Sequence, residues 1–159
     1  MLGTLKLQTL KTIRKMKKMM ALMATLLITL TACADRQQMI QFSELPAEAQ
    51  SFVQKYYNVS DISYVEQDWD DMRYEYTVYL KNATEIEFNH QGNMKSIDCK
   101  RSAVPTGIVP STIVNYVKEH YPNDFIVEYV RDSRRLQVEL NNGWELYFDL
   151  NGNFLRMDD

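Results

Sequence analysis

The sequence predicts an α+β fold: a tandem repeat in which each copy is one helix followed by a four-stranded antiparallel sheet. Three observations predict it. Two amphipathic helical segments with the same spacing of apolar residues begin at Leu45-Pro46 and Val109-Pro110. Each is followed by short segments in which apolar and polar residues alternate, as they do in strands that bury one face. Turns rich in asparagine and glycine, which tolerate the positive φ of tight hairpins, separate these segments.

Each helix is predicted from its start, its apolar face and its end. Proline suits the first turn of a helix because its missing N–H would have no partner there. Residues on the inner face then recur with the i, i+3, i+4, i+7 spacing of a one-sided helix. They are Ala49, Phe52, Val53 and Tyr56 in the first copy and, 64 residues later, Ile113, Tyr116, Val117 and His120 in the second. Asn58 and Pro122 end the helices at matching places.

Four strands are predicted after each helix. We expect them at 62–67, 73–80, 84–88 and 94–99 in the first copy, and at 125–131, 136–140, 144–150 and 154–157 in the second. In the segment 73–80, Tyr76 and Val78 point to one side and Thr77 and Tyr79 to the other, which indicates a sheet with one buried face.

The domain boundaries follow from this pattern. We predict a signal peptide with a lipobox at 1–33, a polar tether at 34–41, the first helix–sheet repeat at 42–100, a linker at 101–108 and the second repeat at 109–159. Pro105 and Gly107 mark the linker, because both residues punctuate regular structure.

The first 33 residues differ from the rest of the chain. They hold six basic residues and no acidic one, followed by an apolar run from Met19 to Leu30. A basic segment before an apolar run of this length is typical of a secretory signal peptide. The run is shorter than the roughly 20 apolar residues that span a bilayer, although a permanent signal anchor is the alternative. Translation from Met1 and translation from Met16 both preserve this pattern.

The apolar run ends in Leu30-Thr31-Ala32-Cys33. This segment resembles the lipobox of bacterial lipoproteins, which implies cleavage before Cys33, diacylation of Cys33 and a lipid anchor in a membrane. The alternative is cleavage after the A-x-A pattern that ends at Ala34, which would release a soluble periplasmic protein. We therefore predict an exported protein, either a periplasmic or cell-envelope lipoprotein or a soluble periplasmic protein.

Removal of the leader changes the charge balance. The mature chain keeps 12 of the 18 basic residues and all 21 acidic residues, a net charge near −9. Nucleic-acid binding requires basic surfaces, so this class of partner is excluded. An acidic surface favours a cationic partner, or serves only to keep the protein soluble.

The sequence contains no motif for catalysis, for a cofactor or for a metal ion. Cys99 is the only thiol left once Cys33 is lipidated, and we expect it to be a small buried side chain. Its one possible base is His90, across the final hairpin of the first copy. His120 lies on a helical apolar face, where a core or boundary position is expected. The acidic stretch 68–71 lacks the glycine and distal glutamate of a calcium loop and is expected to be a solvated loop.

The turn and strand pattern of both copies resembles the PepSY-like, putative β-lactamase-inhibitor-like proteins, which are exported or lipoprotein-type proteins of Gram-negative bacteria. The pattern is carried by Glu85, Phe88, Asn89, Gly92, Asn93 and Asp98, and again by Glu145, Phe148, Asp149, Gly152, Asn153 and Asp158. The resemblance covers about Gln41 to Asp159. It implies tandem helix–sheet units whose sheets together form a concave surface, and the link of related modules to peptidase regulation implies protein binding. Fold similarity does not imply β-lactamase inhibition, and no inhibitory residue carries over.

The remaining candidate site is the less apolar face of the sheet. Tyrosine is enriched at interface hot spots, and acidic neighbours steer a basic partner. The predicted face comprises Glu75, Thr77, Tyr79, Glu85, Glu87, Gln137, Glu139, Glu145, Tyr147 and Asp149. We predict a non-enzymatic envelope module that binds a protein or peptide with a basic patch through this open sheet face. A structural accessory lipoprotein of an envelope complex and a hydrolase are the alternatives, and no oligomeric state is predicted.

Overall fold

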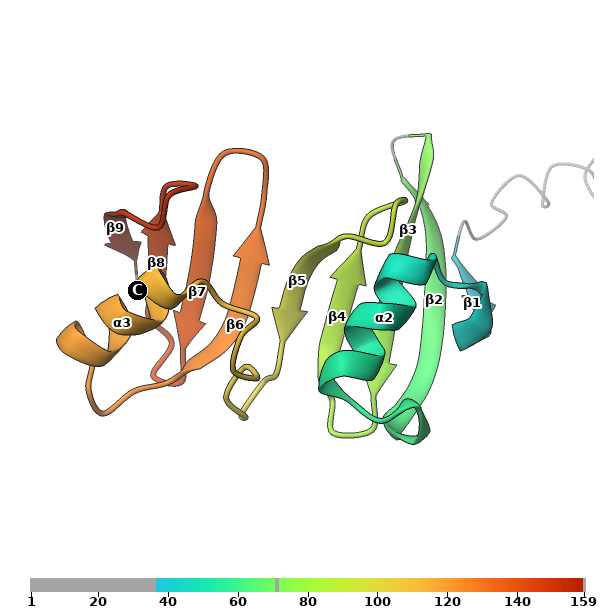
Figure 1. Ribbon diagram of the computed structural model, residues 1–159, viewed down its shortest axis with the longest axis horizontal. Coiled ribbons are helices and arrows are strands. Elements are labelled where there is room, and N and C mark those ends of the chain that lie inside the picture. The colour runs from blue at the N-terminus through green and yellow to red at the C-terminus, as the bar shows by residue number, and fades with distance from the viewer. Residues whose placement is uncertain (1–36, 71, 159) are drawn as a thin grey trace, which may run out of the picture. The chain divides into compact units, whose positions relative to one another are not determined.

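The structure is a computed structural model that describes residues 37–70 and 72–158 (Figure 1). The predicted signal peptide, Cys33 and the first residues of the predicted tether lie outside the described residues. Within the described residues the chain forms nine strands, two α-helices and two short 3-10 helices. Each α-helix has ten residues, and no helix in this part of the chain is long and apolar enough to cross a membrane.

The helices lie at several points between the strands along the chain. The α-helices are α2 (Ala47–Tyr56) and α3 (Ser111–His120), and the 3-10 helices are η2 (Phe42–Glu44) and η3 (Val59–Asp61). The strands are β1 (Gln38–Ile40), β2 (Ile62–Asp70), β3 (Arg73–Leu80), β4 (Glu85–Phe88), β5 (Met94–Asp98), β6 (Ile126–Arg131), β7 (Leu136–Leu140), β8 (Glu145–Phe148) and β9 (Phe154–Asp158).

The strands form one antiparallel sheet that runs in chain order from β1 to β9. The predicted tandem repeat of a helix with its own four-stranded sheet is therefore wrong, although the α+β class is right. The two halves are joined because β5 pairs with β6, with Ser96 opposite Val130 and Asp98 opposite Glu128. An unpaired edge strand exposes a row of N–H and C=O groups, and this pairing satisfies them for both strands. Alternation within a strand does not reveal its partner across a long connection.

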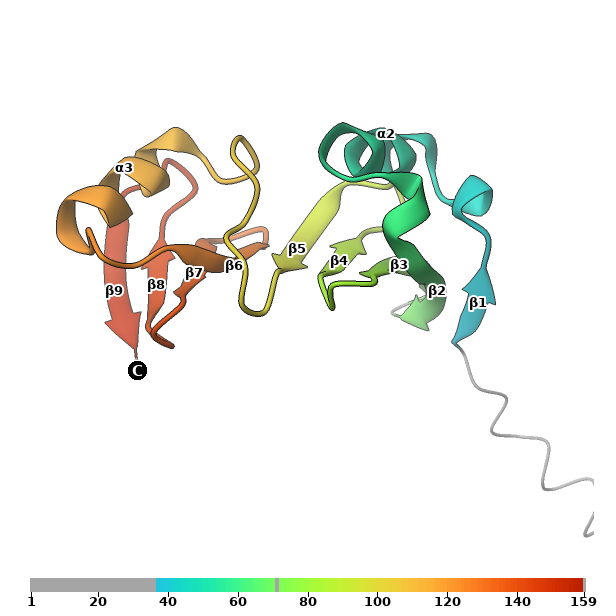
Figure 2. The ribbon, with the colours of Figure 1, turned by 90° about the horizontal axis from the view of Figure 1, so that it is seen from below.

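Both α-helices lie on the same face of the sheet, where they cover its apolar side chains (Figure 2). Phe52 of α2 meets Phe88 of β4 edge-on, with 5.6 Å between the ring centroids. Tyr116 of α3 meets Phe148 of β8 in the same way at 5.4 Å. The first three positions of each predicted inner face pack in the core, whereas His120 at the fourth position of α3 is exposed. We call the opposite face of the sheet, which neither helix covers, the open face.

Two turn glycines hold the helix starts close to the sheet. Gly92 lies between β4 and β5 and Gly152 between β8 and β9, with φ of 86° and 83°. A Cβ atom at Gly92 would lie 2.8 Å from Pro46 Cβ, and one at Gly152 would lie 2.2 Å from Thr112 Oγ1. Glycine both adopts the left-handed conformation and leaves room for the helix at these two turns.

The ends of several elements differ from the expected ranges. Part of the predicted tether forms β1, in which Met39 pairs with Glu66 of β2. A solvated loop was expected for the acidic stretch 68–71. Residues 68–70 instead belong to β2, which ends at Asp70. The predicted linker is hydrogen-bonded to elements on both sides of it. Val104 N–H donates to Ile126 O of β6 at 2.9 Å, and Tyr56 Oη of α2 donates to Gly107 O at 3.3 Å.

Candidate binding face

Nine of the ten residues predicted for the binding face share the open face of the sheet. In β3, Glu75, Thr77 and Tyr79 alternate with the buried Val78 and Leu80, which face the helices. The same alternation in β4, β7 and β8 places on the open face Glu85, Glu87, Gln137, Glu139, Glu145 and Tyr147. The side-chain period of two therefore gathers these nine side chains on one face of the sheet.

Asp149 is the exception, because it follows the end of β8 and serves its own turn. Its carboxylate accepts hydrogen bonds from the backbone N–H groups of Asn151 and Asn153, both at 2.9 Å, and from the Asn153 amide at 2.8 Å. These bonds, above all those from Asn153, lower the pKa of Asp149. Asn89 holds the matching turn with bonds to Gln91 N–H and Asn93 N–H at 3.0 Å. The carboxylate of Asp149 thus stabilises a turn.

The strand register aligns carboxylates across six neighbouring strands of the open face. We call this set the acidic row. Each member is paired with the next by strand register: Glu85 of β4, Asp98 of β5, Glu128 of β6, Glu139 of β7, Glu145 of β8 and Asp158 of β9. Neighbouring strands lie about 4.8 Å apart, so the carboxylates are close enough to repel one another. Sequence reasoning missed Asp98, Glu128 and Asp158 as members, because their alignment depends on the pairing of β5 with β6 and on the position of the final edge strand.

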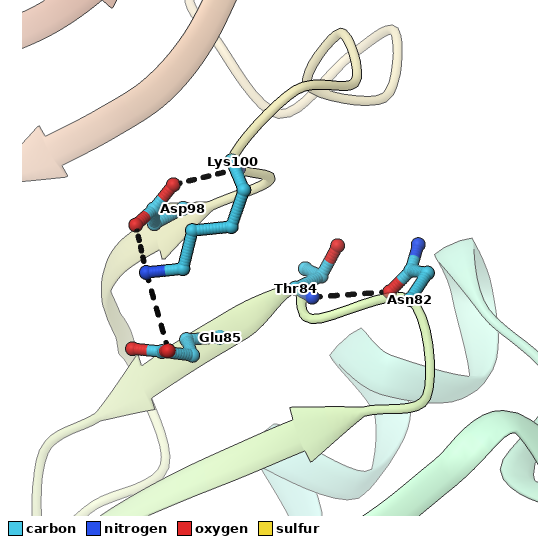
Figure 3. Close-up of polar contacts among 5 residues, drawn as sticks. All are labelled: Asn82, Thr84, Glu85, Asp98 and Lys100. Carbon is cyan, nitrogen blue, oxygen red and sulfur yellow. Dashed lines mark hydrogen bonds and ion pairs between the residues drawn. The ribbon is translucent and has the colours of Figure 1, made fainter.

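Lys100 neutralises one end of the acidic row (Figure 3). Its Nζ contacts the carboxylate of Asp98 and lies 3.2 Å from Glu85 Oε1. Its backbone N–H donates to Asp98 Oδ1 at 2.7 Å. Its backbone φ is 56°, which is unusual for a residue other than glycine. These contacts, led by the hydrogen bond to Asp98, raise the pKa of Lys100. A lysine ammonium group can therefore sit between carboxylates of neighbouring strands in this row.

Arg156 supplies the cation at the other end. Its guanidinium contacts the carboxylate of Asp158 and lies 3.8 Å from the centroid of the Tyr147 ring. Arg135 approaches the same ring at 5.0 Å. Tyr147 is only 7% exposed as a result, and its hydroxyl donates to Glu145. The ring is thus covered by the protein's own cations rather than presented to a partner.

The middle of the row has no cation. Among residues 37–70 and 72–158, no ion pair involves Glu128, Glu139 or Glu145. Burial, and then the charges of Asp98 and Glu139, raise the pKa of Glu128 to about 7. Three carboxylates on adjacent strands therefore form the part of the row that makes no ion pair within the described residues.

Tyr79 extends the open face beyond the acidic row. It is paired with Glu85 by strand register, and its ring stacks on Tyr64 of β2 with 4.4 Å between centroids. Burial, followed by the neighbouring Glu66, raises the pKa of Tyr79 to about 12. The two rings form an aromatic surface of the kind that contacts partner side chains.

The residues considered for catalysis differ in their surroundings. Cys99 is 3% exposed, as expected for a small buried side chain, and burial raises the pKa of its thiol. Tyr57 Oη lies 3.8 Å from the sulfur. His90 is exposed in its turn. His120 is also exposed and stacks on Tyr116 with 4.1 Å between ring centroids, which makes it a boundary rather than a core residue.

Metal binding requires oxygen or nitrogen ligands that converge on one point. In the part of the chain that the structure describes, no group of three histidine, cysteine, aspartate or glutamate side chains is placed to hold a metal ion. The acidic row is instead extended, with its carboxylates side by side on successive strands.

A single meandering sheet with both helices on one face and a row of carboxylates on the other defines a small α+β protein with an acidic, exposed sheet surface. The family model described as putative beta-lactamase-inhibitor-like, PepSY-like matches residues 74–156, from β3 to β9. The chain belongs to this family, which confirms the resemblance inferred from its turns and strands.

Solved structures agree with this assignment. A putative periplasmic protein of the DUF2874 family from Bacteroides vulgatus is 32% identical, with a TM-score of 0.75, covering 79% of this chain and 99% of that one. A putative calcium-regulated periplasmic protein from Bacteroides thetaiotaomicron is 32% identical, with a TM-score of 0.73, covering 77% and 97%. A second Bacteroides vulgatus protein, described as a putative periplasmic protein of unknown function, is 30% identical, with a TM-score of 0.72, covering 77% and 99%.

These neighbours are all described as periplasmic proteins, which supports a periplasmic location for this chain. A search of the curated proteins finds no match.

Proposed function

We propose that this protein is a non-enzymatic binding module of the periplasm that holds a basic segment of a protein or peptide against its open sheet face. The observation that carries the proposal is the uncompensated middle of the acidic row. Within the part of the chain that the structure describes, Glu128, Glu139 and Glu145 make no ion pair, whereas Lys100 and Arg156 already neutralise the two ends. Charge-assisted hydrogen bonds from lysine or arginine of a partner would complete the row in the way that Lys100 does within the chain.

The spacing of the row suggests the form of the partner. Three carboxylates on adjacent strands span about 10 Å across the sheet, since strands are about 4.8 Å apart. An extended peptide places alternate side chains on one side at intervals of about 6.6 to 6.8 Å. Two basic residues separated by one position would therefore bracket Glu139 and reach both of its neighbours. Tyr79 and Tyr64 offer adjoining aromatic surface for an apolar side chain of the same segment.

A labelled peptide with lysine at alternate positions, Gly-Lys-Gly-Lys-Gly-Lys-Gly, tests this proposal by fluorescence anisotropy. We expect binding that weakens as sodium chloride is raised, because the attraction is between charges. The variant Glu128→Gln with Glu139→Gln should weaken binding by about tenfold, since two charge-assisted contacts are lost. The matched control is Glu48→Gln with Glu119→Gln, two exposed residues of the helices on the other face of the sheet. Equal binding by both double variants would remove the acidic row from the proposal.

Calcium is the competing cation, because one similar structure belongs to a protein described as putative calcium-regulated. Carboxylates attract calcium, but a calcium site needs six to eight oxygens around one point. The side-by-side arrangement of the row favours separate ammonium or guanidinium groups. Repeating the peptide titration in calcium chloride and in magnesium chloride at equal ionic strength separates the two cases. Displacement by calcium alone, at concentrations where magnesium has no effect, would favour a calcium site.

We also propose that lipidation of Cys33 anchors the module to a membrane. The support is the lipobox at the end of the apolar run, together with the periplasmic location of the similar proteins. Mass spectrometry of the native N-terminal peptide tests the proposal. A diacylated Cys33 at the N-terminus is expected, whereas an unmodified terminus after Ala34 would show a soluble periplasmic protein.

A further inference from the structure

A cleft of about 940 Å³ opens on the face of the sheet that carries the helices. One wall comes from Phe52 of α2, and the other from Val114 and Lys118 of α3 with the loop that precedes it. The floor comes from β5 and β6, and Figure 1 shows β5 uncovered between the two helices. Volumes of about 300 to 1,000 Å³ are typical of sites for small molecules.

Apolar side chains form part of the lining of the cleft, beside polar ones. Val109 and Tyr129 line it and are almost fully buried, at 8% and 2% exposure. Phe52 is fixed by its edge-on contact with Phe88, and Val114 is half-buried on the facing helix. An apolar ligand body placed against these side chains would remove their remaining surface from water, which favours binding.

Two cations at the rim of the cleft have no counter-ion. Of the other charged residues there, Lys95 is held by Glu75 at 2.5 Å and Asp132 by Arg135 at 3.4 Å. Within residues 37–70 and 72–158, Lys118 and Arg131 make no ion pair, and both line the cleft. The cleft therefore presents positive charge beside apolar surface, in a chain whose mature form carries a net charge near −9.

We propose that this cleft binds an organic anion with an apolar body. The body packs between Phe52 and Val114, and the carboxylate, sulfonate or phosphate group reaches Lys118 and Arg131. A guanidinium presents two parallel donors to such a group, and an ammonium adds a mobile positive charge. The acidic row on the opposite face would repel the same ligand, so the two surfaces select partners of opposite charge.

Two fluorescent probes test the charge requirement with the purified protein. Anilinonaphthalene sulfonate combines an aromatic body with one anionic group, and N-phenylnaphthylamine has the same aromatic body without the charge. We expect the sulfonate to bind the protein at least about tenfold more tightly than the neutral probe, because two cations act on one anion. Equal affinities for the two probes would overturn the proposal, as would failure of the sulfonate to bind.

Variants at the rim locate the site. Lys118→Gln with Arg131→Gln should weaken sulfonate binding by about tenfold and leave the neutral probe unchanged. The matched control is Arg101→Gln with Arg134→Gln, which removes the same charge at exposed residues that do not line the cleft. Asn115→Trp, at an exposed residue of the lining, should block both probes without changing the charge.

Circular dichroism and thermal unfolding establish that each variant is folded, which is expected because the substituted side chains are exposed. Glu128→Gln with Glu139→Gln should leave sulfonate binding unchanged, which separates this site from the acidic row. Sulfonate affinity that is the same in the rim double variant and in its control would overturn the proposal.

Discussion

Glu128 of β6 lies directly opposite Glu139 of β7, and Asp98 of β5 lies on its other side. Like charges directly opposite each other on neighbouring strands are destabilising. Burial, and then the charges of these neighbours, raise the pKa of Glu128 to about 7. The row is thus a cost to the folded chain that a cationic partner would remove.

The first prediction is that the protein is more stable at pH 5 than at pH 8. The pKa of Glu128 rises from 4.5 to about 7 on folding, so the folded chain binds its proton more tightly than the unfolded chain between these values. The free energy of unfolding therefore falls as pH rises through this window. We expect a loss of about 1 kcal/mol, discounted because the side chain is half-exposed.

Urea unfolding at several pH values measures this loss, and Glu128→Gln serves as the control because it cannot ionise. The variant should show a smaller change in stability between pH 5 and pH 8 than the natural chain. A stability that rises with pH over this range in the natural chain and is unaffected by the substitution would contradict the role given to Glu128.

The second prediction concerns the turn glycines. Gly92→Ala should cost about 3 kcal/mol, because the new Cβ meets both the left-handed backbone and the Ala49 backbone nitrogen at 2.9 Å. Gly143→Ala should cost about 1 kcal/mol, since Gly143 has a similar φ of 90° but nothing lies within 4 Å of its Cβ position. The difference between the two losses in stability measures the effect of the close contact between Gly92 and the start of α2.

Gly152→Ala should fall between these two, because its nearest obstacle is the Thr112 side chain rather than backbone. Adding Thr112→Ala should recover part of the loss at Gly152. Chemical unfolding of all the variants gives the comparison. If Gly92→Ala and Gly143→Ala were equally destabilising, the contact between the turn and α2 would contribute nothing to the free energy of unfolding.

Local patterns in the sequence predicted the parts of the fold that depend on local physics. The i, i+4 spacing located α2 and α3, and the alternation in 73–80 and 136–140 matched β3 and β7 residue for residue. The pairing of β5 with β6 was missed because the sequence of neither strand indicates which strand it pairs with. A three-residue strand such as β1 is too short to show a period.

The candidate site shows the same division between local and long-range information. Alternation placed Glu139 and Glu145 on the open face, but their alignment with Glu128 and Asp98 exists only in the joined sheet. Asp149 was misplaced although its turn had a local signal. An aspartate followed by Asn151, Gly152 and Asn153 is typical of a side chain that bonds to the backbone two residues on.

The third prediction is that Cys99 reacts with Ellman's reagent only when the chain unfolds. The thiol is 3% exposed, and burial raises its pKa, so little thiolate is present or accessible in the folded state. The rate of labelling should follow the fraction of unfolded protein as urea is raised. A Cys99→Ala variant identifies any signal that comes from Cys33. Fast labelling of Cys99 without denaturant would contradict the buried position.

The last prediction uses Lys100, which occupies the end of the acidic row that a partner would otherwise reach. Lys100→Gln frees the carboxylates of Glu85 and Asp98, so two more acceptors extend the row beyond Glu128. We expect the alternating lysine peptide to bind about threefold more tightly, in the range of a single exposed ion pair. Stability should change little, because Lys100 and both carboxylates are partly exposed.

Lys118→Gln is the control for Lys100→Gln, since it removes the same charge from the helix-bearing side of the protein. If general attraction to an acidic protein governed binding, both substitutions would tighten it equally. If the row itself is the site, the substitution of Lys100 tightens binding more, and this advantage disappears when Glu85→Gln and Asp98→Asn are added. Anisotropy titrations of the natural chain and these three variants at low and high salt distinguish the two cases, because binding along the row depends on which face of the sheet loses its cation.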